Sequence, residues 1–322
     1  MTTVIIGANG QLGAELMLTR IGDGRVIGVT HLDVEITDRH SVERALKAIA
    51  PAHGEAMVIV NAAAYNLVDE CEQNRDKAFA VNAAGAGNVA AVAAQIGATV
   101  VHFSTDYVFD GAKGEPYVET DAPHPISVYG DSKLAGERAV RAANPHHYIL
   151  RTSGLYGHAP PTGRGQNFAE MMLRRAEECR SGGGAVEAVS DQRLSPTCTR
   201  SLAQLLPKII GRAPFGLYHV TNAGGCSWFE FAQELFRLAS LSVDLRPISS
   251  AQLRRPAKRP ANSVLENAAL RALGLDFMPP WREALAEYLR GRKPATLPAA
   301  AGAGKPATGG QAGFMRSPVG PC

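Results

Sequence analysis

Short runs of consecutive apolar residues alternate with longer amphipathic stretches over the first 150 residues of the chain. The runs are continuous, which is typical of parallel strands that are buried on both faces. They lie at Val4–Ile6, Val26–Val29, Met57–Val60, Thr99–Phe103 and Tyr148–Leu150. The stretches between them predict helices at Gln11–Leu18, Ser41–Ala50 (with Ser41 as its N-cap), Arg75–Ile96 and Lys133–Ala142. This alternation predicts an α/β fold with a doubly wound parallel sheet covered by helices on both faces.

The alternation becomes looser after Arg151, which indicates a smaller second domain. The sequence predicts a mobile, glycine-rich loop over 157–166 and helices at Asn167–Arg180, Ser227–Ala239 and Leu265–Leu273. We therefore expect a Rossmann-type dinucleotide domain over 1–150 with a return segment at about 187–225, and a substrate domain over 151–186 and 226–290. Residues 291–322 are rich in Ala, Gly, Pro and Lys and have little to bury, so we expect a disordered tail.

Composition excludes several classes of protein. The 322 residues are 45% hydrophobic, which is enough for one large core or two modest ones, and 33 basic residues nearly balance 30 acidic ones. There is no basic stripe of the kind that binds nucleic acid, and no apolar run long enough to span a membrane. The N-terminus does not resemble a signal peptide, and the five cysteines are scattered without metal-ligand spacing. These features predict a cytoplasmic protein without a metal site.

A glycine motif follows the first predicted strand. Gly7, Gly10 and Gly13 stand between that strand and the first helix. Glycines there permit a tight turn and let a pyrophosphate approach the free N–H groups of the helix N-terminus. The alternative is a plain turn, because the motif alone is not specific. Its position between a strand and a helix favours a dinucleotide site.

The end of the second predicted strand bears on the choice of cofactor. A carboxylate at that point normally binds the adenosine ribose of NAD. Here the strand ends at Thr30-His31. The nearest acid, Asp33, lies a few residues beyond the position at which that carboxylate normally stands. This favours NADPH over NADH, although no arginine is placed to bind a 2′-phosphate; alternatively, Asp33 only caps a turn.

After the third strand, the small residues of Asn61-Ala62-Ala63-Ala64 either leave room for a cofactor or simply start a helix.

Tyr129 and Lys133 are four residues apart, so both side chains emerge on one face of a helix. An ammonium near a phenol stabilises tyrosinate, which lets the tyrosine exchange a proton near neutral pH. Most such pairs are only solvated helix faces. However, Ser104-Thr105-Asp106 follows the fourth strand, and a threonine hydroxyl there can bind the same substrate oxygen as the tyrosine. Together these residues predict a proton-transfer site.

The chain resembles the dTDP-4-dehydrorhamnose reductases of the extended short-chain dehydrogenase/reductase superfamily from residue 1 to about 290. Besides the glycine motif and Asn61-Ala62-Ala63, the segments that carry the resemblance are Ser104–Phe109, Glu119–Asp121, Tyr129–Glu137, Arg151–Ser153, Asn167-Phe168, Asp191-Gln192, Pro196-Thr197 and Arg259–Ser263. Ser104–Phe109 and the run around Tyr129 are specific to this family; the glycine turn is not.

The resemblance implies hydride transfer from NADPH or NADH to the C4 keto group of a dTDP-linked sugar. It makes Tyr129 the proton donor, with Lys133 lowering its pKa and holding the nicotinamide ribose, and Thr105 orienting the keto oxygen. It implies a cofactor site at Gly7, Gly10, Gln11, Leu12, Gly13, Asp33, Val34, Ala63, Ala64, Tyr65, Asn66, Tyr129 and Lys133. It implies substrate contacts from Thr105, Asp106, Gly154, Asn167, Arg259 and Ser263.

The chain departs from the family pattern in ways that affect the substrate. Gly154 stands where the family commonly has a tryptophan that contacts the deoxysugar, and Leu194 stands in a loop that commonly has glycine. Asn66 replaces a usual threonine, and Thr30 stands where some members have an acid. Some members dimerise through Mg²⁺; Glu15 matches one such ligand position, but a lone surface glutamate is more often solvated, and we predict no metal.

Three further groups have structural alternatives. His102 lies in an apolar strand and is expected to be a core histidine. Trp228, Phe229 and Phe231 are expected to be helix core. The cluster Arg254, Arg255, Lys258 and Arg259 either contacts the substrate diphosphate or forms a solvated face.

The sequence thus predicts a 4-keto reductase that acts on dTDP-4-dehydro-L-rhamnose, a small-molecule nucleotide sugar, and that forms a homodimer if it follows its family. The alternatives are a reductase for another 6-deoxy sugar nucleotide and a regulatory subunit that binds a dinucleotide without turnover.

Overall fold

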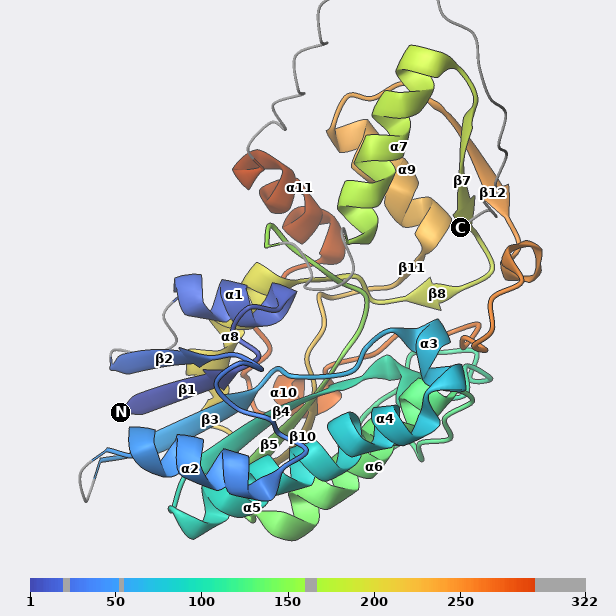
Figure 1. Ribbon diagram of the computed structural model, residues 1–322. Coiled ribbons are helices and arrows are strands. Elements are labelled where there is room, and N and C mark those ends of the chain that lie inside the picture. The colour runs from blue at the N-terminus through green and yellow to red at the C-terminus, as the bar shows by residue number, and fades with distance from the viewer. Residues whose placement is uncertain (20–23, 52–54, 160–166, 293–322) are drawn as a thin grey trace, which may run out of the picture. The chain divides into compact units, whose positions relative to one another are not determined.

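Six parallel strands form the central sheet of the computed structural model, which describes residues 1–19, 24–51, 55–159 and 167–292 (Figure 1). The strands are β1 (Thr2–Ile6), β2 (Arg25–Val29), β3 (Met57–Asn61), β4 (Thr99–Thr105), β5 (His147–Thr152) and β10 (Gly216–His219). Their order is β10-β5-β4-β3-β1-β2, and every pairing is parallel. Because β2 and β3 lie on opposite sides of β1, the connections reverse there, and the carboxyl ends of β1 and β3 border a crevice suited to a ligand. The predicted doubly wound parallel sheet is confirmed.

Helices cover both faces of this sheet, as the alternation of side chains along each strand requires. Ile5 packs in one core with α1 (Gln11–Thr19), α8 (Thr199–Ile209) and α10 (Ala268–Ala272). Its neighbours Val4 and Ile6 pack in the other core, with α2 (Arg39–Ile49), α5 (Ala86–Gln95) and α6 (Val128–Ala143). The short helices α3 (Val68–Gln73) and α4 (Arg75–Phe79) contact α6. The two cores hold the strand ends that carry the site.

Several boundaries differ from the prediction. Asp38, not Ser41, is the N-cap of α2, because the Asp38 side chain accepts a hydrogen bond from the His40 backbone N–H (2.9 Å). The predicted helix over 75–96 consists of α4, a π-helical turn at Ala80–Gly85 and α5. Helix α6 begins at Val128 with Ser127 as its N-cap, so Tyr129 lies in its first turn.

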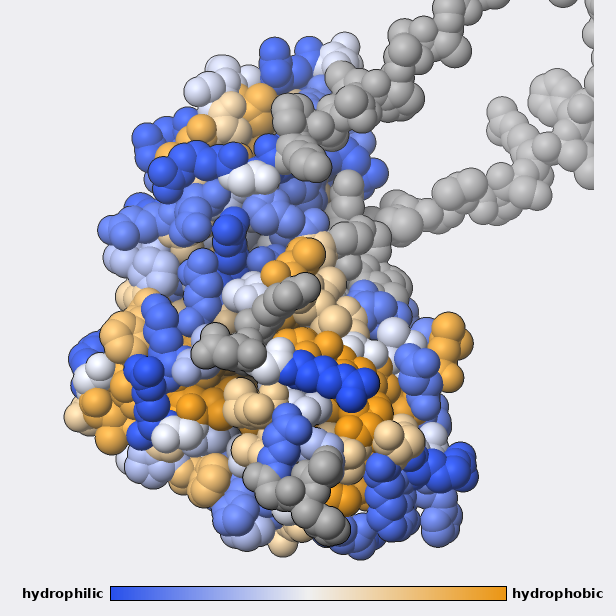
Figure 2. Space-filling model, turned by 90° about the vertical axis from the view of Figure 1, so that its left-hand side faces the viewer, coloured by the Kyte–Doolittle hydropathy of each residue, from blue (hydrophilic) through white to orange (hydrophobic). Residues whose placement is uncertain are grey.

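A second lobe follows β5. It contains α7 (Phe168–Gly182), α9 (Trp228–Leu238), α11 (Trp281–Gly291) and a 3₁₀ turn at Ser250–Leu253. Short strands pair in three small sheets: β7 (Ala185–Val189) with β12 (Asp244–Ile248), β8 (Arg193–Leu194) with β11 (Cys226–Ser227), and β6 (Leu155–Tyr156) with β9 (Thr197–Cys198). Tyr156, Phe231, Trp281 and Tyr288 fill the core of this lobe. In Figure 2, hydrophilic residues cover most of the second lobe, at the top of the view, and hydrophobic residues are more frequent below it.

The second half of the chain contributes to both lobes. The predicted return segment, 187–225, supplies α8 and β10 to the sheet lobe, whereas its first part, 187–198, contributes to β7, β8 and β9 of the second lobe. The expected helix over 265–273 is the shorter α10, which packs on the sheet lobe. Residues 1–291 form one unit, so the predicted domain boundaries stay a prediction. Residues 160–166 of the predicted loop and 293–322 of the predicted tail lie outside the described residues.

Candidate active site

The glycine turn between β1 and α1 has no room for side chains. Gly7 has a φ of +81°, a conformation that favours glycine. A Cβ at Gly7 would lie 2.9 Å from the Ala63 backbone nitrogen, and a Cβ at Gly13 would lie 2.1 Å from the Gly7 carbonyl oxygen. The turn thus brings the start of α1 close to β1 and leaves its N-terminus open, which is the arrangement that binds a pyrophosphate.

One cavity of about 590 Å³ runs from this turn along the carboxyl ends of the strands into the second lobe. Its walls at the glycine turn include Gly7, Gly10, Gln11 and Leu12. Gln11 Nε2 is buried and has no hydrogen-bond partner among the described residues, so it is available to a ligand. The cavity also reaches Tyr129, Lys133 and Thr105, so most of the predicted cofactor residues and the proton-transfer residues surround one space, whereas Gly13 is not among its lining residues.

The end of the cavity beside β2 carries a different acid from the one predicted. Asp33 Oδ2 accepts hydrogen bonds from the Thr30 N–H and hydroxyl (both 2.8 Å), which lower the pKa of this exposed carboxyl. Asp33 therefore caps a turn, and it is not among the residues that line the cavity. Val34 lines it as predicted, together with Glu35 and His31, which the sequence reasoning missed.

The loop after β3 is held by a residue that the sequence reasoning also missed. Asn82, in the π-helical turn, bonds the backbone N–H and carbonyl of Tyr65 (2.8 and 2.9 Å) and the Ser132 hydroxyl on α6 (2.9 Å). Its only signal in the sequence is one amide within an alanine-rich run. The loop presents Ala63, Ala64 and Asn66 to the cavity. The Tyr65 side chain instead donates to Glu70 Oε2 (2.9 Å) and is not part of the cavity wall.

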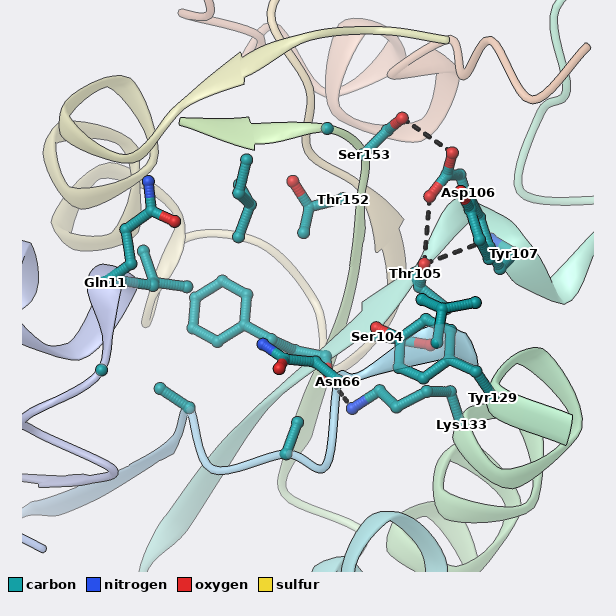
Figure 3. Close-up of a pocket in the computed structure, with 18 of the residues that line it drawn as sticks. Gln11, Asn66, Ser104, Thr105, Asp106, Tyr107, Tyr129, Lys133, Thr152 and Ser153 are labelled. Atoms are coloured by element: carbon teal, nitrogen blue, oxygen red, sulfur yellow. Dashed lines mark hydrogen bonds between the residues drawn. The ribbon is translucent and has the colours of Figure 1, made fainter. Parts of the chain in front are cut away.

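Tyr129 and Lys133 project from α6 toward the end of β4 (Figure 3). The Tyr129 ring packs edge-on against Tyr107, with 5.8 Å between ring centroids. Lys133 Nζ donates to the Phe103 carbonyl oxygen (2.6 Å) and is buried. Burial lowers the pKa of Lys133 to about 8, so at neutral pH it is still a cation beside the cavity.

Asp106 joins three segments of the chain behind this pair. Thr105 donates its hydroxyl to Asp106 Oδ1 (3.0 Å) and accepts from the Tyr107 N–H (3.2 Å). Ser153, at the end of β5, and Ser263, from the C-terminal part, both donate to Asp106 Oδ2 (2.8 and 2.5 Å). Burial raises the pKa of Asp106 to about 6, although these three hydrogen bonds act in the opposite direction. The acid fixes the orientation of the Thr105 hydroxyl.

The predicted substrate residues are not all in the cavity wall. Thr105, Asp106, Gly154, Asn167 and Ser263 line it, and Asn167 also caps α7 through the Glu170 N–H (3.0 Å).

Arg259 does not lie on a solvated face, which was one of the two alternatives for its cluster. It forms a bidentate ion pair with Asp69 of α3 (2.8 and 3.0 Å), and only 9% of its side chain is exposed. It is not among the lining residues, so its contact with a substrate diphosphate stays a prediction.

The cavity wall also includes residues that were not predicted as part of the site, among them Trp228 and Thr152. Trp228 was expected in the core, but it is half-buried and lines the cavity beside Phe168, whereas Phe231 is buried as expected. Thr152 also lines the cavity, and its Oγ1 is buried without a partner among the described residues.

Two side chains discussed from the sequence lie outside the cavity wall. His102 is in the core as predicted, and burial holds its pKa well below the usual value. Glu15 is buried rather than on the surface. Within the described ranges, no cluster of three or more His, Cys, Asp or Glu side chains could hold a metal ion, and no helix is long and apolar enough to cross a membrane.

Comparison with known proteins gives a consistent result. A family model described as the RmlD substrate binding domain matches residues 1–293. The chain is 40% identical to a dTDP-4-dehydrorhamnose reductase from Streptomyces griseus, with 95% of this chain and 96% of that protein covered. It is also 40% identical to a protein from Streptomyces antibioticus named as a probable dTDP-4,6-dihydroxy-2-methyloxan-3-one 4-ketoreductase, over 89% of this chain and 94% of that one. A crystal structure of the dTDP-4-dehydrorhamnose reductase from Bacillus anthracis in complex with NADP is similar, with a TM-score of 0.81, 37% identity, and coverage of 90% of this chain and 98% of that one. The chain belongs to the RmlD substrate binding domain family.

Proposed function

We propose that this protein reduces the C4 keto group of dTDP-4-dehydro-L-rhamnose to give dTDP-L-rhamnose, with NADPH as the reductant. The observation that carries the proposal is one cavity lined by a phosphate-binding glycine turn, Tyr129, Lys133 and Thr105. The similarity to reductases that are named for this substrate supports it over most of the chain.

The residues at the glycine turn fit a dinucleotide. Gly7 and Gly13 let the turn pack against the protein's own backbone, where any Cβ would clash, and Gln11 Nε2 has no partner among the described residues. We assign the pyrophosphate to Gly10, Gln11 and Leu12, the adenosine to the end near Val34, and the remaining length to Ala63, Ala64 and Asn66. When it is bound, the nicotinamide supplies the hydride. NADH is the alternative reductant, and the carboxylate of Glu35 at the adenosine end is compatible with it.

Side chains of the protein supply the proton that the reduction consumes. Tyr129 donates its phenolic proton to the oxygen at C4 as that oxygen gains charge, and the Lys133 ammonium stabilises the tyrosinate that remains. We assign the orientation of the keto oxygen to Thr105. Its hydroxyl donates to Asp106 Oδ1 in the unliganded protein, and it turns from that acid to donate to the keto oxygen when the substrate binds. The reaction consumes one hydride and one proton for each carbonyl that becomes an alcohol. No step requires a metal ion, and we propose none.

Two alternatives remain. A reductase for another 4-keto-6-deoxy sugar nucleotide is favoured by Gly154 and by the similar protein from Streptomyces antibioticus. A regulatory subunit that only binds a dinucleotide is less well supported, because Tyr129, Lys133 and Thr105 are all present at the cavity. We further propose that the protein acts in the cytoplasm; the homodimer that the resemblance implies stays a prediction for sedimentation analysis.

The product identifies the reaction. We expect NMR of the product from dTDP-4-dehydro-L-rhamnose to show dTDP-L-rhamnose, with the C4 proton in the axial position. Its C4 epimer, or reduction only of a different keto sugar in a panel of dTDP-linked substrates, would contradict the proposed substrate but not the class of reaction.

A further inference from the structure

The space above Gly154 is filled by another residue of the same cavity wall. Gly154 follows Ser153 at the end of β5 and has a φ of +50°. A Cβ built on it would lie 2.5 Å from Leu194 Cδ1 and 3.4 Å from the Pro196 Cα. Leu194, in β8, is only 5% exposed, and it lines the cavity together with Gly154. Glycine at 154 and leucine at 194 are therefore sterically linked.

An aromatic pair continues this wall. Phe168 is the first residue of α7 and Trp228 is the first residue of α9, and their ring centroids are 4.4 Å apart at an angle of 45°. Both rings are half-buried and line the cavity. Aromatic faces bind the apolar faces of ligands and add geometric preference to simple burial. The second lobe thus presents a surface with two aromatic rings and one aliphatic side chain to the ligand.

This surface lies next to the groups that hold the reacting oxygen. Ser153 bonds Asp106 (2.8 Å), and Asp106 bonds Thr105 (3.0 Å). Gly154 is the next residue after Ser153, so a ligand whose keto oxygen meets Thr105 brings its ring, rather than its distant base, toward Gly154. A 6-deoxy sugar carries a single carbon substituent without a polar atom, the C6 methyl group. Its other positions carry oxygen and need polar partners.

We propose that Leu194, Phe168 and Trp228 form a subsite for the apolar side of the sugar, in which Leu194, seated over Gly154, contacts the C6 methyl group and selects 6-deoxy sugars. The inference rests on the proposed function and makes Leu194 a specificity-determining residue. A C6 hydroxyl would be left without a partner against the leucine. An apolar pocket rejects an added hydroxyl by up to about 100-fold, which sets the upper limit for this preference.

Ligand binding tests the subsite without turnover. The probes are dTDP-L-rhamnose and dTDP, which share the nucleotide and differ by the sugar, and calorimetry gives both affinities. In the intact protein we expect dTDP-L-rhamnose to bind more tightly than dTDP. Leu194→Ala withdraws the apolar contact from the single C6 methyl group, so we expect about a fourfold loss of affinity for dTDP-L-rhamnose and no change for dTDP.

The matched control is Leu173→Ala. Leu173 is 2% exposed in the core of the same lobe and is not part of the cavity wall. It should lower thermal stability and leave the ratio of the two affinities unchanged. If Leu194→Ala keeps the ratio of the intact protein, the subsite is wrong although the proposed function stands. If the intact protein does not prefer dTDP-L-rhamnose over dTDP, the proposed substrate itself is contradicted.

A second variant keeps the test valid if Leu194→Ala does not fold. Gly154→Ala places a Cβ against Leu194 and should lower the same affinity ratio by displacing that side chain. Gly274 has a φ of +67° and open space around its Cβ position, so Gly274→Ala measures the effect of the backbone conformation alone. We expect Gly154→Ala to lower the melting temperature more than Gly274→Ala does. Equal losses, with an unchanged affinity ratio, would overturn the proposed contact.

Discussion

The hydroxyl of Ser263 lies 2.5 Å from Oδ2 of Asp106, although 157 residues separate the two in the sequence. Through this hydrogen bond the C-terminal part of the chain reaches the end of β4, where Asp106 in turn holds the Thr105 hydroxyl (3.0 Å). The orientation of one candidate catalytic residue therefore depends on a segment that folds far along the sequence. Asp106 is also buried, so its ionisation affects stability.

We expect Asp106→Asn to change the pH dependence of stability. Burial raises the pKa of Asp106 from 3.8 to about 6 in the folded protein. The folded state thus keeps this proton when the unfolded chain has lost it, and the protein loses stability as the pH rises from about 4 to 6. The asparagine variant lacks this loss. Relative to the unmodified protein, its free energy of unfolding should rise by about 2 kcal/mol between pH 4 and pH 8.

Urea denaturation at the two pH values measures this difference. Asp244→Asn, at an exposed position, serves as the control. A difference between Asp106→Asn and the unmodified protein that is the same at both pH values would contradict the effect assigned to Asp106.

Glu137→Gln should be one of the most destabilising single substitutions beneath the site. Glu137 accepts two hydrogen bonds from Arg151 (2.8 and 2.7 Å) and one from the Ser104 hydroxyl (2.5 Å), and both charged side chains are at most 4% exposed. Its removal leaves the buried Arg151 charge without its partner, which costs about 3–5 kcal/mol. Breaking the exposed pair Asp244–Arg246 should cost less than about 1 kcal/mol. Similar losses for the two substitutions, measured by urea denaturation, would show that Glu137 does not stabilise a buried charge.

The reduction should slow as the pH rises through about 8. Lys133 is buried and its pKa is lowered to about 8, so above that pH it loses the charge that stabilises the tyrosinate of Tyr129. We expect kcat/KM of the unmodified protein to decline in this range. In Lys133→Met it should be low and show no such decline, with folding checked by circular dichroism. A decline with the same midpoint in Lys133→Met would assign the titration to another group.

Cofactor preference should respond to Glu35 rather than to Asp33. Glu35 lines the cavity near the predicted adenosine position, and hydrogen bonds from Thr37 lower its pKa, so it is ionised at neutral pH. Such a charge repels the 2′-phosphate of NADPH. Because two charges 4 Å apart in water interact with about 1 kcal/mol, Glu35→Gln should tighten NADPH relative to NADH by about fivefold.

Asp33→Asn is the matched control, because Asp33 is bonded to Thr30 outside the cavity wall. Fluorescence titration with both cofactors measures the ratio. If Asp33→Asn changes the ratio and Glu35→Gln does not, the adenosine end has been assigned to the wrong carboxylate.

The sequence was sufficient for the parts of this protein that local patterns determine. The five predicted strands are continuous apolar runs, and Tyr129 and Lys133 share a helix face because of their spacing. Strand β10 was missed because Gly216–His219 is short and only partly apolar, and α8 because Pro207 interrupts its pattern.

Parts of the site that depend on distant contacts could not be predicted. Trp228 lines the cavity only because α9 packs beside α7. Arg259 instead forms an ion pair with Asp69 of α3 and is not part of the cavity wall. Asn82 connects the loop after β3 with α6, a relationship that the sequence does not reveal. The steric link between Gly154 and Leu194 likewise requires the folded chain.

The central claim is that Tyr129 supplies the proton for reduction of a dTDP-linked 4-keto sugar. The measurement that tests it most directly is NADPH oxidation, followed by absorbance, on addition of dTDP-4-dehydro-L-rhamnose to the unmodified protein and to Tyr129→Phe. We expect rapid turnover that falls by roughly 10²- to 10⁴-fold in the variant, with NADPH binding retained. A variant that remains nearly as active as the unmodified protein, or an unmodified protein that binds NADPH and does not oxidise it with this substrate, would contradict the account.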